Sequence, residues 1–188
     1  MDVLLLSTAT VALAEIGDKT QLLALLLAAR YRQPWPIVAG ILVATLVNHA
    51  ASAWIGAWAA GLFSPQLLHW AVALSFLAVA AWTLVPDKLD ADEVRSPRYG
   101  AFIATTAAFF LAEIGDKTQV ATIVLAAKYS PLWQVIAGTT IGMLAANAPV
   151  AAMGAKFADR LPLKAARLAA AGLFALLGLW AAWGALAT

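Results

Sequence analysis

The sequence predicts an all-α integral membrane protein with six transmembrane helices, built from two inverted three-helix repeats. Of the 188 residues, 63% are hydrophobic and only 12% are charged, a composition far from that of soluble domains. Segments 13–21 and 111–119 both read LAEIGDKTQ, which reveals an internal repeat. The basic residues outside this motif gather in alternate loops, as expected for a membrane protein of fixed orientation.

Six apolar segments approach or exceed the roughly 20 residues that a helix needs to cross a bilayer. The expected spans are 3–30, 35–60, 66–85, 99–128, 132–156 and 163–187. They divide into a first repeat at 1–86 and a second at 99–188. A linker at 87–98, rich in charge and proline, joins the two repeats and is expected to be cytoplasmic.

The repeat extends well beyond the nine-letter motif. A shift of 98 residues superimposes Gly40 on Gly138 and Gly56 on Gly154, and it places His49 on Asn147. Each repeat therefore holds three spans. Because three is an odd number, the second repeat must enter the membrane from the opposite side, which defines an inverted repeat.

The loop charges predict the orientation. One side carries nine basic residues, whereas Lys128 alone lies on the other. The nine are Arg30, Arg32, Lys88, Arg95, Arg98, Lys156, Arg160, Lys164 and Arg167. Since cytoplasmic loops are enriched in Lys and Arg, both termini are expected outside the cytoplasm. The chain is thus expected in the cell (inner) membrane as a multi-pass protein.

The repeated motif places charge deep in the bilayer. Fifteen residues separate Glu15 from Arg30 and Glu113 from Lys128, which corresponds to about 22 Å along a helix. Both Glu side chains are therefore expected near mid-membrane. Each Asp or Lys there costs about 2.5–3.5 kcal/mol on insertion, so ionisable groups at this depth usually have a function.

Within each motif the acids share one helix face, because they are three residues apart. The expected cation ligands are Glu15, Asp18, Glu113 and Asp116. Possible additional ligands are Gln21, Gln119, Asn48 and Asn147, whereas Lys19 and Lys117 are expected to balance charge. Thr20 and Thr118 are expected to bond their own helix backbone, and His49 is left undecided between packing and a role beside the ligands. The intervening glycines, Gly17 and Gly115, allow a close backbone approach or a local helix break.

This ligand set indicates a divalent cation. The chain has no cysteine, so a thiolate site is excluded. Several hard oxygen ligands suit Ca²⁺ or Mn²⁺. Carboxylates packed closely are not all ionised when empty, so protons are expected to compete with the metal for one site. No prosthetic group is expected, and the net charge of +2 requires no nucleic acid partner.

The doubled EIGDKT, at 15–20 and 113–118 in two hydrophobic halves, resembles the Golgi-type calcium/manganese–proton exchangers and their bacterial manganese exporters. The resemblance covers nearly the whole chain. It implies a secondary transporter in which the motif acids form the cation site. It further implies Mn²⁺ export from the cytoplasm in exchange for H⁺, with Ca²⁺/H⁺ exchange as the alternative.

Two other classes compete with this interpretation. A non-transporting membrane scaffold could use the same charges as buried ion pairs that set helix register. A membrane enzyme is less favoured, because no nucleophile, histidine cluster or phosphate-binding loop accompanies the acids. The sequence leaves the preference between Mn²⁺ and Ca²⁺, the proton stoichiometry and the oligomeric state open.

Overall fold

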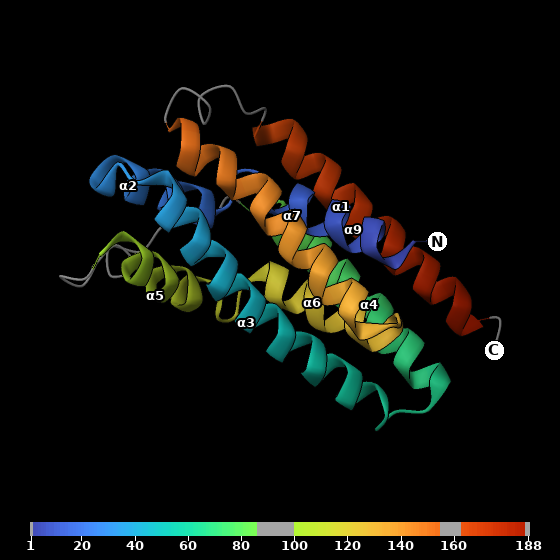
Figure 1. Cartoon of the computed structure of the whole chain (residues 1–188). Coiled ribbons are helices and arrows are strands. Elements are labelled where there is room, and N and C mark those ends of the chain that lie inside the picture. Colours follow the sequence, from blue (N-terminus) through green and yellow to red (C-terminus); the bar gives the residue numbers. More distant parts are fainter. Residues whose placement is uncertain (1, 86–99, 155–162, 187–188) are drawn as a thin grey trace.

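The computed structural model describes residues 2–85, 100–154 and 163–186, and these form a bundle of helices (Figure 1). The described part contains eight helices. In chain order they are α1 (Val3–Glu15), α2 (Lys19–Tyr31), α3 (Pro34–Ala60), α4 (Pro65–Thr83), α5 (Ala101–Glu113), α6 (Lys117–Lys128), α7 (Leu132–Met153) and α9 (Leu163–Leu186). The linker expected at 87–98 lies outside the described residues.

Four of these helices are long and apolar enough to cross a membrane. They are α3, α4, α7 and, from Lys164 onward, α9. Helices α1 and α5 are also apolar but have only 13 residues each, which gives a length of about 20 Å. The segments expected as spans at 3–30 and 99–128 each consist of two shorter helices, α1 with α2 and α5 with α6.

Each break falls within the repeated motif, at its glycine. Helix α1 ends at Glu15, and Gly17 then adopts a φ of 85° before Asp18 caps the start of α2. In the second half Gly115 has a φ of 75°, and Asp116 precedes α6. Only glycine adopts such positive φ values readily, so the motif encodes the break locally. The local break that the glycines allow is thus present in both halves.

The two halves contact each other in equivalent ways. Helix α1 packs along α7, and α3 packs along α5 and α6 (Figure 1). Glycines on the long helices permit this close approach: Gly138 faces Leu4 and Ser7, and Gly40 faces Phe102 and Thr105. Because each residue in one contact lies 98 positions from its counterpart in the other, the repeat in the sequence is also a repeat in the packing.

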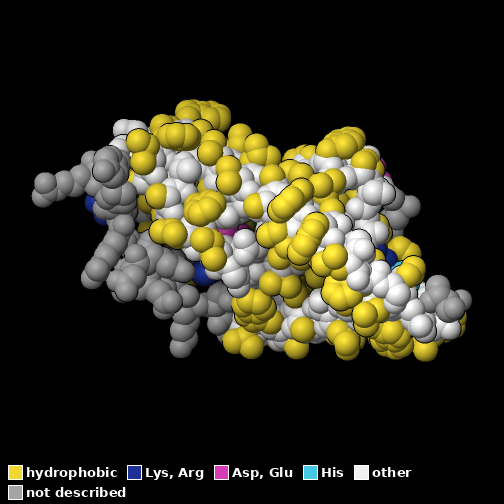
Figure 2. Space-filling model, turned by 90° about the horizontal axis from the view of Figure 1, so that it is seen from below, with side chains coloured by type: hydrophobic (Ala, Val, Ile, Leu, Met, Phe, Trp, Pro, Cys, Tyr) yellow, Lys and Arg dark blue, Asp and Glu magenta, His cyan; other side chains and the backbone are white. Residues whose placement is uncertain are grey.

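The remaining pair, α4 and α9, packs together with Phe76 stacked on Phe174 at a ring-centroid distance of 6.1 Å. Hydrophobic side chains cover most of the face seen in Figure 2. Leu74, Leu111 and Leu176 are 63%, 64% and 66% exposed. So much apolar surface is unfavourable in water and suits a lipid environment.

We predict that Gly138→Ala destabilises the contact between α1 and α7. An added Cβ would lie 2.6 Å from the Leu4 carbonyl oxygen and 2.8 Å from the Ser7 Cβ. Such overpacking costs about 1–3 kcal/mol, which should lower the thermal unfolding temperature of the purified protein in detergent. Gly172→Ala is the matched control, because no described heavy atom lies within 4 Å of its added Cβ. Equal effects of the two substitutions would contradict the prediction.

Candidate cation site

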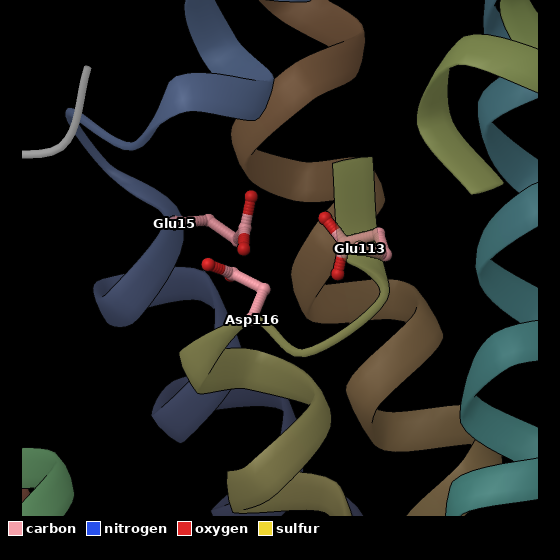
Figure 3. Close-up of side chains that lie close together, drawn as sticks. All are labelled: Glu15, Glu113 and Asp116. Atoms are coloured by element: carbon pink, nitrogen blue, oxygen red, sulfur yellow. The ribbon is translucent and has the colours of Figure 1, made fainter. Parts of the chain in front are cut away.

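The helix breaks bring acids from both halves together. Glu15 is the last residue of α1, Glu113 is the last of α5, and Asp116 directly precedes α6. Each offers a carboxylate oxygen, and these three oxygens lie within 4.8 Å of one another (Figure 3). Both Glu side chains are 0% exposed and Asp116 is 3% exposed. The cluster therefore lies in the interior, although its residues come from helices far apart in the sequence.

Three ionised carboxylates at this spacing repel one another strongly. At an effective dielectric constant of 20, each pair of charges about 5 Å apart is unfavourable by on the order of 3 kcal/mol. A divalent cation or bound protons would offset this repulsion. The arrangement is thus suited to holding positive charge.

Threonine hydroxyls orient the two glutamates. Thr20 donates a hydrogen bond to Glu15 Oε2, and Thr118 donates to Glu113 Oε2 at 2.9 Å. The expectation that these threonines bond their own helix backbone is therefore wrong. Each is the second residue of a helix that begins after the break, so no complete turn precedes it to offer a carbonyl. The other oxygen of each glutamate, Oε1, has no hydrogen-bond partner among the described residues.

The asparagines have different roles in the two halves. Asn147 donates to Glu15 Oε2 at 3.1 Å, so it lies directly beside the cluster. Asn48 instead donates to the Phe110 carbonyl at 3.1 Å, which links α3 to α5. His49, the counterpart of Asn147 in the repeat, is 0% exposed, and neither of its ring nitrogens has a hydrogen-bond partner in the described part of the chain.

The two glutamine carbonyls complete the helix breaks. Gln21 Oε1 accepts a hydrogen bond from the Gly17 amide at 2.9 Å, and Gln119 Oε1 accepts one from the Gly115 amide at 2.7 Å. Both oxygens were expected as possible cation ligands, but in this structure each satisfies a backbone donor that the break exposes. A third contact joins the halves, because Gln21 Nε2 donates to the Ala146 carbonyl at 3.0 Å.

The fourth acid of the motif pairs with a lysine of the other half. Lys117 Nζ lies 3.4 Å from Asp18 Oδ2, and both side chains are buried. Spacing along one helix instead suggested that each lysine would face the glutamate four residues before it. Asp18 is not part of the three-carboxylate group, and Lys19 is half-buried at the start of α2. The structure thus brings three of the four expected acids together and places the fourth in an ion pair between the halves.

Comparison with known proteins identifies the family of the chain. A family model described as "Divalent cation/proton antiporter GDT1" matches residues 3–91 and 101–188, that is, both halves of the chain. The chain belongs to this family. The expected resemblance to the calcium/manganese–proton exchangers is thereby confirmed.

Three relatives illustrate the range of the GDT1 family. A Vibrio cholerae protein named "Putative manganese exporter" is 57% identical over 95% of this chain and 90% of its own length. A GDT1-like protein of Synechocystis is 29% identical over 92% of this chain and 93% of its own. GDT1-like protein 5 of Arabidopsis thaliana is 30% identical over 92% of both chains. No solved structure matches the chain significantly.

Membership of the GDT1 family settles the class of the protein. The family comprises antiporters of divalent cations and protons, so this protein is a transporter and not an enzyme. Its four long apolar helices agree with a multi-pass membrane protein. The family description names divalent cations and protons as the ions that its members exchange.

We predict that the pair between Lys117 and Asp18 is needed for folding. Lys117→Met leaves a buried carboxylate without this counter-charge, a change that costs about 3–5 kcal/mol in other proteins. Thermal unfolding in detergent should show this loss, and the double variant Asp18→Asn/Lys117→Met should recover a large part of it. Lys128→Met, at the half-buried end of α6, is the control and should have a small effect. Independent, additive effects of the two substitutions would show that the pair is not coupled.

Proposed function

We propose that this GDT1 protein exports Mn²⁺ from the cytoplasm in exchange for protons, and that the cation binds at the buried carboxylate cluster. The observation that carries the proposal is the convergence of Glu15, Glu113 and Asp116, from both halves, within 4.8 Å. The unpartnered Oε1 atoms of the two glutamates are the natural first ligands. Asn147, which already donates to Glu15, and Asp18, three residues after Glu15, are candidates to complete the set as the helices move.

The ligand chemistry is compatible with Mn²⁺, and the name of one relative favours Mn²⁺ as the transported cation. Carboxylate and amide oxygens suit Mn²⁺ and Ca²⁺ and are poor ligands for soft ions. The relative that is 57% identical carries manganese export in its name. Ca²⁺/H⁺ exchange is the alternative, because the same oxygen ligands accept Ca²⁺ in a larger or more flexible site.

Exchange follows from competition at one site. Carboxylates this close need either protons or a divalent cation to offset their repulsion. A proton gradient can then drive the cation out, because protons loaded from outside displace it. The direction, from the cytoplasm outward, is part of the proposal and requires a flux measurement.

The architecture that we propose for this exchange is six membrane spans in two inverted repeats, at 1–86 and 99–188. In it, α1 with α2 and α5 with α6 each form one broken span. Two observations support it. The glycine contacts are equivalent in the two halves. The start of α1 and the end of α9 lie at the same end of the bundle (Figure 1). The distribution of basic residues among the loops in the sequence, nine against one, supports an orientation with both termini outside the cytoplasm.

We predict that Glu15→Gln and Glu113→Gln each abolish Mn²⁺ flux while the protein still folds. Each change removes a negative charge from the cluster but keeps the size of the side chain. Flux into proteoliposomes should be measured together with the luminal pH, which should change in step with Mn²⁺ movement in the wild type. Asp2→Asn is the matched control. It also replaces a carboxylate by an amide, but it does so at the exposed N-cap of α1, where Asn can still cap the helix. Unchanged flux in the folded glutamate variants would rule out this cluster as the site.

We further predict that Mn²⁺ stabilises the purified protein. At a concentration 100 times its Kd, a ligand that binds only the folded state adds about 2.7 kcal/mol. The unfolding temperature should rise with added Mn²⁺, fall again with a chelator, and respond far less in Glu113→Gln. Parallel titrations with Ca²⁺ and Mg²⁺ rank the cations. A larger shift with Ca²⁺ than with Mn²⁺ would favour the calcium alternative.

A further inference from the structure

The two ends of the bundle differ at a pair of equivalent glycines. Gly56, near the end of α3, is buried against Ile123 of α6, and an added Cβ would lie only 2.1 Å from the Ile123 carbonyl oxygen. Gly154 follows α7 at the equivalent position of the second half. It is half-buried, and an added Cβ would meet no described heavy atom within 4 Å. One contact is therefore closed and its counterpart is open.

A cavity occupies the place of the missing contact. It has a volume of about 300 Å³ and lies between α2 and α7. Leu25, Ala29, Arg32, Ala151 and Gly154 are among the residues that line it. Leu25 is the residue equivalent to Ile123, since the two lie 98 positions apart. The partner that Gly154 would need for an equivalent contact thus lines the same cavity but does not touch it.

Exposure along the two broken spans follows the same asymmetry. Ala29 of α2 is exposed and Ala28 is half-buried, whereas their counterparts on α6, Ala127 and Ala126, are half-buried and buried. The end of α2 is therefore less covered than the equivalent end of α6.

The two helices that line the cavity, α2 and α7, also contact the carboxylate cluster. Gln21 lies one helical turn before Leu25 on α2, and its amide donates to the Ala146 carbonyl of α7 at 3.0 Å. The next residue of α7, Asn147, donates to Glu15. The two helices that line the cavity are therefore joined to each other by Gln21, and α7 is joined to Glu15 by Asn147.

We propose that this structure is the conformation open at the α2 and α7 end, and that the cavity is the route from that end to Glu15. In the opposite conformation Gly154 packs against Leu25, as Gly56 now packs against Ile123, and the contact between Gly56 and Ile123 separates. This inference rests on the proposed transport function and, with the orientation proposed above, makes the present state open to the cytoplasm. Equivalent residues form both contacts, so the protein can exchange one for the other at little cost.

The absence of cysteine makes a direct test possible, because any introduced pair is the only pair. In the double variant Leu25→Cys/Gly154→Cys, a short thiol cross-linker should join the two positions when Mn²⁺ and a proton gradient allow turnover. Cross-linking should lower Mn²⁺ flux at least tenfold, and cleavage of the cross-link should restore it. Flux that persists in cross-linked protein, or failure to cross-link in protein that transports, would overturn the proposal.

A second variant covers the case in which Gly154→Cys alone fails to fold, since Gly154 has a φ of 65°. Leu25→Trp should fill the cavity and block closure, so that flux falls at least tenfold while Mn²⁺ binding changes less than threefold. Leu26→Trp, on the adjacent exposed position, is the matched control and should leave flux within twofold of the wild type. Normal flux in Leu25→Trp, or equal loss in both, would overturn the proposal.

If the wild type itself carried no cation flux, the proposed transport function would be wrong. The cross-linking yield would still report whether the α2 and α7 end closes.

Discussion

Much of this structure depends on one constraint, which is that a helix that breaks must find partners for the backbone groups that the break exposes. Each motif solves this problem within a few residues. Gly17 and Gly115 permit the turn, and the carbonyls of Gln21 and Gln119 accept hydrogen bonds from the amides of these glycines. Since a backbone donor away from water is costly without a partner, the glycine and the glutamine of the motif act as a pair. The acids then lie at helix ends, where their carboxylates extend beyond the packed helices toward the other half.

The second half is needed for the same reason. The first break contributes one carboxylate to the cluster and the second contributes two, and either set alone offers too few ligands for a divalent cation. The contact between α1 and α7, and that between α3 and α5, bring the two breaks to the same place. Asp18 and Lys117 add an ion pair between the breaks. The two copies of the motif are therefore parts of one interior cluster and not two separate sites.

The sequence predicts a large part of this arrangement and misses what depends on the break. Composition, the 98-residue repeat and the duplicated acids are visible in the letters, because they rest on hydrophobicity and on identity between segments. Spacing arguments for side chains assume a continuous helix. That assumption fails at Gly17 and Gly115, so it does not predict the bond from Thr20 to Glu15, that from Gly17 to Gln21, or the pair of Lys117 with Asp18. Contacts between halves, such as that of Asn147 with Glu15, depend on the packing of α7, which no local pattern specifies.

The acids also differ in the electrostatic potential that the backbone creates around them, because some lie at the start of a helix and others at its end. Asp18 and Asp116 lie at the start of α2 and α6, where the helix macrodipole is positive and a carboxylate is stabilised. Glu15 and Glu113 are the last residues of α1 and α5. At this end of a helix the macrodipole is equivalent to about half a negative elementary charge. The backbone thus compensates the aspartates and adds to the negative potential at the glutamates. The negative ends of α1 and α5 therefore meet at the cluster beside the positive end of α6, so that within one group of acids the backbone favours a cation at the glutamates and negative charge at Asp116.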